Sequence, residues 1–137
     1  MNSFLRTTDL LSRGLDAASL RYDVSANNLA NSEVPHFKRT DVNFESELKA
    51  ALDSEIRAKS AFQMTRTNDR HIPVVQPVDY RSVEPRRVLD YVSTVKANGN
   101  NVDSDEEAML VLKTQMQYQM LAMLQGFEYS QIRSVLK

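Results

Sequence analysis

The stretch SANNLANSEVPHF, residues 25–37, decides where the first long helix of this chain ends. Asn27, Asn28 and Asn31 lie close together there, although asparagine is a poor helix-interior residue because its side chain competes for backbone hydrogen bonds. Val34 precedes Pro35, and a proline pushes the residue before it toward extended geometry. The sequence therefore predicts a helix that stops near residue 32 and is followed by a turn.

Upstream of this stretch, the residues follow a heptad seam of the kind that packs a helix along a partner helix. Alternating steps of four and three residues connect Phe4, Thr8, Leu11, Leu15, Ala18, Tyr22, Ser25 and Leu29. The seam is narrow, and several of its residues are small. We expect an N-terminal helix over residues 3–32, about 45 Å long at 1.5 Å per residue.

The middle of the chain, residues 33–102, contains all of its prolines. Phe44, Leu48, Leu52 and Ile56 recur at helical spacing and predict a shorter helix near residues 43–58. Beyond it, scattered valines and prolines favour extended chain, with short strands expected at 61–66 and 86–92. The stretch KANGNN, residues 96–101, is typical of a turn.

The strongest helix signal covers residues 103–136. Asp103 is a good N-cap, with Glu106 as its capping-box partner. One apolar seam on this helix consists of Met109, Leu112, Met116, Met120, Met123 and Phe127. A second seam, rotated by about 100°, consists of Leu110, Leu121, Leu124, Ile132 and Val135.

A helix with two apolar seams needs neighbours on two sides, and the chain supplies one long partner helix with a thin seam. The surplus predicts further partners from other chains. The expected fold is mainly all-α, in a single domain of residues 1–137. Its long N- and C-terminal helices form a coiled-coil-like antiparallel pair, with a short second helix and an extended or short-β middle segment.

Composition excludes several function classes. Lys and Arg total 17 against 18 Asp and Glu, so there is no charge excess to attract nucleic acid or an anionic membrane. The chain has no cysteine, and its two histidines, His36 and His71, lie in separate turns. We therefore expect no catalytic residues, no metal site, no cofactor and no enzyme activity. The longest charge-free apolar window, residues 114–127, is too short to span a bilayer, and the N-terminus lacks the apolar run of a cleaved secretory signal.

Residues 25–48, SANNLANSEVPHFKRTDVNFESEL, resemble the N-terminal signature of bacterial flagellar axial proteins, which include rod, hook and hook-associated proteins. His36 replaces the glycine that usually follows the proline of this signature. The matching positions are Ser25, Asn27 or Asn28, Ala30, Asn31, Pro35, Phe37 and Lys38. The stretches 64–73, 99–107 and 117–137 resemble the proximal rod protein family of FlgB type. The sister FlgC type is the closest alternative.

This resemblance implies a structural subunit that polymerises helically into the flagellar rod, the drive shaft that transmits torque and encloses the export channel. It implies a place in the basal body, in the periplasmic rod, reached by flagellar type III export without a cleaved signal peptide. The implied partners are further copies of the chain, rod subunits of FlgC, FlgF and FlgG type, the adaptor FliE, the MS-ring protein FliF and the export apparatus. They include no nucleic acid and no direct membrane span. The seams alone also leave open a soluble coiled-coil adaptor or export chaperone.

We expect assembly contacts from both terminal helices and from the turn after the first. A buried asparagine at a helix interface fixes register at some cost in stability, so the three asparagines are expected to hydrogen-bond to adjoining chains. Alternatively, Asn31 ends the helix itself, since asparagine tolerates the left-handed conformation. The complete set of expected contact residues is Leu11, Leu15, Tyr22, Asn27, Asn28, Leu29, Asn31, Pro35, Phe37, Met109, Leu112, Met116, Met120, Met123 and Phe127.

Overall fold

A computed structural model describes residues 3–62, 68, 70 and 76–136 of the chain. Its internal contacts divide the chain into two compact units, one made of Met1–Val42 with Arg87–Lys137 and the other of Asn43–Arg86. We call them the terminal unit and the middle unit, and we describe each separately. The assignment of residues 1–137 to a single domain stays a prediction.

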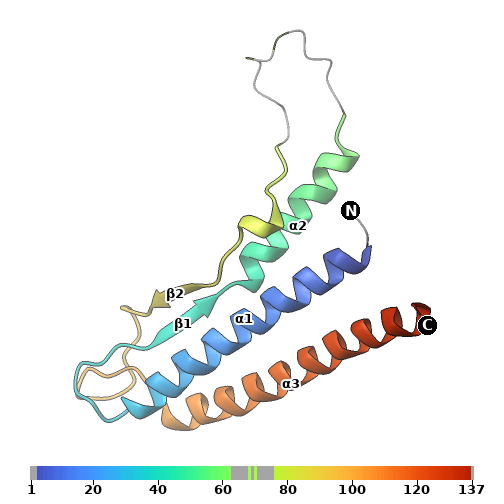
Figure 1. The fold of residues 1–137 in the computed structure, drawn as a ribbon. Helices are drawn as coiled ribbons and strands as arrows, with labels where there is room; N and C mark the ends of the chain where they lie inside the picture. The colour runs from blue at the N-terminus through green and yellow to red at the C-terminus, as the bar shows by residue number, and fades with distance from the viewer. Residues whose placement is uncertain (1–2, 63–67, 69, 71–75, 137) are drawn as a thin grey trace. The chain divides into compact units, whose positions relative to one another are not determined.

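Two long helices dominate the terminal unit, α1 (Ser3–Ala30) and α3 (Ser104–Val135). They lie side by side and run in opposite directions (Figure 1). The rings of Phe4 and Tyr129 meet edge to face with centroids 6.3 Å apart, and a Cβ placed on Gly14 would lie 3.4 Å from Leu121 Cδ1. This arrangement confirms the expected fold class of paired antiparallel terminal helices.

The end of α1 and the start of α3 lie close to the positions that the sequence predicts. α1 stops at Ala30, two residues before the expected boundary. At the start of α3, the Asp103 side chain accepts hydrogen bonds from the backbone N–H groups of Asp105 and Glu106, at 2.9 and 3.4 Å, which confirms it as the N-cap. Among the described hydrogen bonds, Glu106 does not return a side-chain bond to Asp103, so only one half of the predicted capping box forms.

A two-stranded antiparallel sheet pairs β1 (Thr40–Asn43) with β2 (Arg86–Leu89) (Figure 1). The sequence prediction missed β1, because residues 33–42 were interpreted as a turn only. The strand expected at 86–92 is present but ends early, since Asp90 Oδ1 accepts hydrogen bonds from the backbone of Val92 and Ser93 and turns the chain. The strand expected at 61–66 falls mostly outside the described residues, and Ala61 and Phe62 are not in a strand.

In the middle unit, α2 (Glu45–Ser60) packs against η1, a short 3-10 helix at Tyr80–Ser82. The Val78 N–H donates a hydrogen bond to Ser54 Oγ at 2.9 Å, which ties the chain before η1 to α2. The predicted second helix is therefore confirmed, with both ends shifted by about two residues, within the usual uncertainty of helix boundaries.

The buried residues of the terminal unit are small or polar to an unusual degree. Ala17, Ala18 and Val24 of α1 are buried, and so is Val102 just before α3. Small side chains let two helix backbones approach closely but bury little apolar surface each. Seven of the described buried residues are polar or charged, namely Ser25, Asn28, Ser32, Asn100, Asn101, Glu107 and Thr114.

Candidate assembly surface

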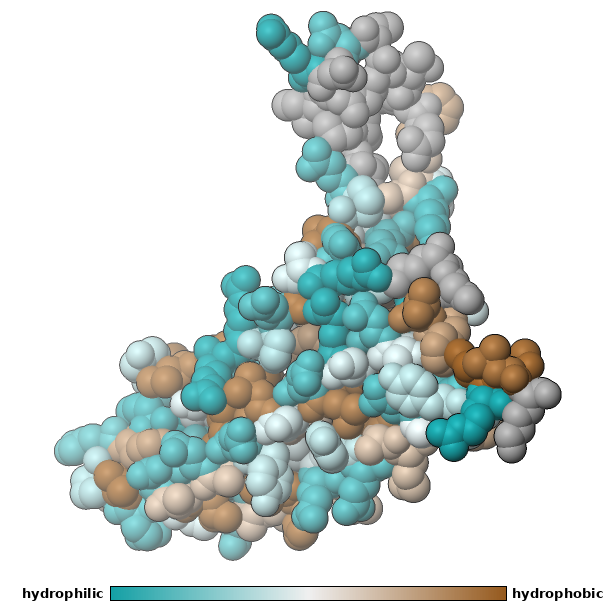
Figure 2. All heavy atoms as spheres, viewed as in Figure 1, coloured by the Kyte–Doolittle hydropathy of each residue, from teal (hydrophilic) through white to brown (hydrophobic). Residues whose placement is uncertain are grey.

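The outer face of α3 carries an exposed apolar ridge, which we call the methionine ridge. It consists of the complete first seam, with exposed fractions of 71% for Met109, 61% for Leu112, 71% for Met116, 55% for Met120, 69% for Met123 and 58% for Phe127. A shallow hollow of about 660 Å³ runs along it and is lined from Met109 to Met123. Figure 2 shows hydrophobic residues exposed among hydrophilic ones on the visible face of the terminal unit.

The ridge faces away from α1. Thr114 and Glu107 are fully buried and mark the face of α3 that packs inward. Met123 follows Thr114 by nine residues, which at about 100° per residue places it about 180° around the helix. The described part of the chain therefore leaves one whole apolar face of α3 without cover.

The second seam of α3 is only partly covered. Leu110, Leu121 and Ile132 are half-buried, and Leu121 packs beside Gly14 of α1. Leu124 is 45% exposed and Val135 is 84% exposed. Part of the second seam is therefore left uncovered as well, at these two positions.

On α1, Leu11, Leu15 and Leu29 are half-buried, whereas Tyr22 is 43% exposed. Tyr22 lies in a second hollow, which we call the tyrosine groove, with a volume of about 400 Å³ between α1 and α3. Its lining consists of Ala18, Ser19, Tyr22, Thr114, Gln115, Tyr118 and Gln119. Gln119 also lines the hollow along the methionine ridge, so the two hollows adjoin at this residue.

The asparagines of the signature act mainly within the chain. Asn28 is 1% exposed, and its amide pairs with the backbone of Thr40: Nδ2 donates to the carbonyl oxygen at 2.7 Å, and Oδ1 accepts from N–H at 3.1 Å. This side chain is therefore not available to an adjoining chain, contrary to the expectation from sequence. Asn27 is exposed, and its proposed intersubunit contact stays a prediction.

Asn31 ends α1, but not by the expected route. Its side-chain Nδ2 donates at 2.8 Å to the carbonyl oxygen of Asn27, which also accepts the Asn31 backbone N–H at 3.1 Å. Among the described non-glycine residues, the positive φ belongs to His36, at 61°. His36 thus adopts the left-handed conformation of the glycine that it replaces, between an exposed Pro35 and a half-buried Phe37.

Two asparagines that the sequence analysis treated only as turn residues hold the end of α1. Asn100 Nδ2 lies within hydrogen-bond distance of three carbonyl oxygens, those of Asn31 at 3.0 Å, Ser32 at 2.9 Å and Val34 at 2.8 Å. Asn101 Oδ1 accepts from the backbone N–H of Arg39 at 2.6 Å. The signal that could have found them is the composition of NGNN, which places two amides beside a turn glycine.

A buried ion pair joins the loop after α1 to the start of α3. Arg39 Nε lies 2.5 Å from Glu107 Oε1, and the Glu107 side chain is 1% exposed. Burial acts to lower the pKa of Arg39, but the hydrogen bond and charge of Glu107, with smaller effects of Asp41 and Glu106, raise it above its ordinary value. Together with the asparagines, this pair forms a polar network at the connected end of the two helices.

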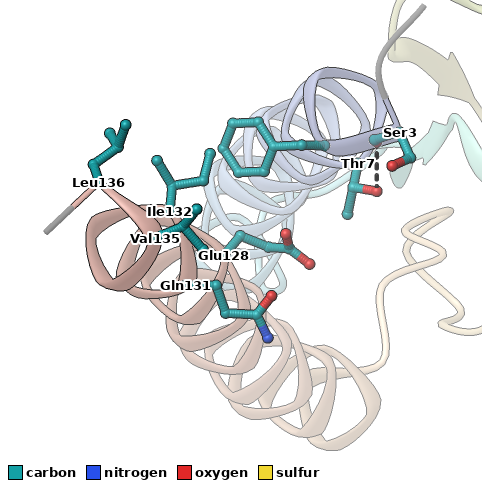
Figure 3. Close-up of a pocket in the computed structure, with 8 residues that line it drawn as sticks. Ser3, Thr7, Glu128, Gln131, Ile132, Val135 and Leu136 are labelled. Atoms are coloured by element: carbon teal, nitrogen blue, oxygen red, sulfur yellow. Dashed lines mark hydrogen bonds between the residues drawn. The ribbon is translucent and has the colours of Figure 1, made fainter.

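The opposite end of the helix pair contains a pocket. A pocket of about 420 Å³ lies between the first turn of α1 and the last turns of α3 (Figure 3). Phe4, Ile132 and Val135 line it together with polar residues such as Thr7 and Glu128. In the pocket lining, the Thr7 hydroxyl donates a hydrogen bond to the Ser3 carbonyl oxygen within α1 at 3.0 Å.

In the described part of the chain, no three His, Cys, Asp or Glu residues are grouped so that they could hold a metal ion. His36 is exposed in its turn, and His71 lies outside the described residues. No described helix is long and apolar enough to cross a membrane.

The fold and surface define the class of protein. It is a helical hairpin with a polar network at its connected end and an exposed apolar ridge on α3. No family profile matches the chain. It is 39% identical to the flagellar basal body rod protein FlgB of Borreliella burgdorferi and 40% identical to that of Borrelia hermsii, over the full length of both chains in each case. The FlgB of Escherichia coli is 33% identical over 82% of this chain and 80% of its own.

The chain belongs to the FlgB family of flagellar basal body rod proteins. Its function is accordingly that of a structural subunit of the rod in the flagellar basal body.

Proposed function

We propose that this subunit occupies the proximal rod and joins its neighbours through the methionine ridge. The observation that carries the proposal is the exposure of all six ridge residues on the face of α3 opposite α1. In the rod, the paired terminal helices pack against those of adjacent subunits, transmit torque and surround the export channel. The protein has a structural role and no catalytic one.

Magnitudes favour polymerisation over a simple dimer. Full burial of a large apolar side chain contributes about 1.5–3 kcal/mol, and the ridge residues are already partly covered. Covering the remainder contributes about 1–2 kcal/mol per residue, or about 6–12 kcal/mol for the six. Association costs about 4–15 kcal/mol, so one such contact is marginal and several simultaneous neighbours are needed.

The proposed neighbours are further copies of this chain, rod subunits of FlgC, FlgF and FlgG type, the adaptor FliE and the MS-ring protein FliF. Delivery uses the flagellar type III export apparatus. A head-to-tail contact whose rotation does not close a ring generates an open helix. The flexible thioether side chains of the ridge suit several slightly different partners.

The test introduces a charge on the ridge. Met116→Glu keeps a similar helix propensity, so α3 should form, but a carboxylate would have to be buried in the subunit contact. We expect loss of swimming and loss of the variant from purified basal bodies. The matched control is Ser12→Glu, which adds the same charge at an exposed position of α1 and should assemble. Normal swimming with Met116→Glu and Met120→Glu combined would overturn the proposal.

A soluble adaptor or export chaperone also uses helical seams, and the two functions separate in the same preparation. A rod subunit stays with basal bodies through detergent and high-salt washing, whereas an adaptor is removed. Recovery of the chain only in the wash would favour the adaptor.

A further inference from the structure

We infer that the tyrosine groove of one subunit receives the methionine ridge of a second copy of this chain. The inference rests on the proposed function and specifies the contact that it requires. The groove and the ridge are different surfaces of the terminal unit, so their contact joins copies head to tail.

The groove is built to accept apolar side chains. Its lining contains no charged residue. Tyr22 and Tyr118, which are 43% and 45% exposed, contribute one ring from each helix. Its floor includes Thr114, which is fully buried. Half-exposed tyrosines beside an apolar hollow are common anchors in protein interfaces.

The second copy is the occupant because the chain itself carries a matching surface. On α1, the large hydrophobic residues that are exposed are Leu5 and Tyr22, which form no continuous stripe. The methionine ridge is continuous over Met109–Phe127, and unbranched methionine side chains fit irregular hollows. Gln119 borders both surfaces, so a ridge docked in the groove would also partly cover the ridge of the receiving copy.

Charge points to the same pairing. Lys113 is the only charged residue between Met109 and Phe127, and it is exposed. On α1, Asp16 and Asp23 are exposed and flank Ser19 of the groove at positions i−3 and i+4, which share one side of a helix. A docked ridge brings the single positive charge of one copy to the acidic rim of the other.

Disulfide trapping tests the contact directly, because the chain has no cysteine of its own. Ser19→Cys reports on the groove and Met116→Cys on the ridge. Mixed single variants of the full-length chain should form a cross-linked dimer that neither forms alone. The double variant should form a ladder of higher multimers, as a head-to-tail contact requires. Ala30→Cys, exposed at the end of α1 outside the groove, is the matched control and should not link to Met116→Cys.

Charge reversal adds a second readout. Lys113→Glu, or Asp16→Lys with Asp23→Lys, should each lower the cross-linking yield about twofold to fivefold, as expected for exposed ion pairs. Combining the three changes should restore the yield. Restoration that weakens at high salt would identify the pairing as electrostatic.

The outcomes separate this inference from the proposed function when the same cysteine variants are oxidised in isolated basal bodies. A discrete Met116→Cys dimer without a ladder would mean a symmetric ridge-to-ridge contact and overturn the groove. A photoreactive residue placed at position 19 that links only to other rod proteins would overturn the second copy as occupant. In both cases the subunit is still found in the basal body, whereas its absence there would refute the proposed function itself.

Discussion

Glu107→Gln tests whether the ion pair with Arg39 holds the connected end of the helix pair. Removal of one partner from a buried ion pair costs about 3–5 kcal/mol. Arg39 is 21% exposed and keeps Asp41 at 3.6 Å, and glutamine still offers an oxygen to its Nε. We therefore expect a smaller loss of about 2–3 kcal/mol in the free energy of local opening.

Hydrogen exchange with mass spectrometry measures this local opening without requiring the whole chain to unfold in one step. At 1.4 kcal/mol per tenfold change, peptides over residues 37–42 and 100–108 should exchange about 30 to 150 times faster. The control is Glu106→Gln, because Glu106 is exposed and shares the first turn of α3. It loses the same favourable interaction with the helix dipole. Rates that differ less than threefold between the two variants would refute the role of the ion pair.

Four further predictions follow from single side chains. Thr114→Val should raise the free energy of unfolding by about 1 kcal/mol in urea titrations, because Thr114 Oγ1 is buried without a hydrogen-bond partner. His36→Gly should raise it by about 0.5–1 kcal/mol in the same assay, since glycine adopts positive φ without strain. Asn28→Ala should lower it by about 1–3 kcal/mol by leaving the Thr40 backbone unpaired, whereas Asn27→Ala should change it by less than about 0.5 kcal/mol. Hydrogen bonds from the Ser93 side chain, then from the backbone of Ser93 and Val92, lower the pKa of Asp90 below 3.8. The turn they form should therefore persist at neutral pH and open only as the pH falls through that lowered pKa. Hydrogen exchange measures this opening as faster exchange of residues 91–93, after correction for intrinsic rates. The Asp90→Asn variant should no longer show this dependence on pH.

The sequence was sufficient to predict the elements whose signals are local. Heptad spacing marked α1 and α3, Asp103 marked the start of α3, and the proline after Val34 marked the end of α1. The exposure of the methionine ridge was also foreseeable, because one thin partner seam cannot cover two faces of a helix. The helix boundaries follow from residues near one another in the chain, and the exposure of the ridge follows from comparing the seams of the two helices.

The elements that the sequence did not predict depend on distant partners. β1 pairs with β2, which lies far along the chain, and the backbone of its first residue, Thr40, is also held by the side chain of Asn28. Glu107 looked like an ordinary acidic residue in a helix first turn, yet its partner Arg39 lies 68 positions away. Nothing in the local pattern distinguishes such a residue from its exposed neighbour Glu106.

The polar network sets the register of the helix pair, which the apolar seam alone specifies weakly. A seam of small and flexible side chains specifies helix register weakly, because apolar contacts are non-directional and tolerate a shift along the helix. Asn100 bonds to the Ser32 carbonyl oxygen, and Glu107 pairs with Arg39, only when the loop after α1 meets the start of α3 in one alignment. A slip by one turn would leave a buried amide or carboxylate without its partner. The free-energy cost of that loss exceeds the cost of shifting the apolar contacts by one turn. Register within the chain is thus set by polar groups at one end, which leaves the methionines free to adapt to neighbouring subunits.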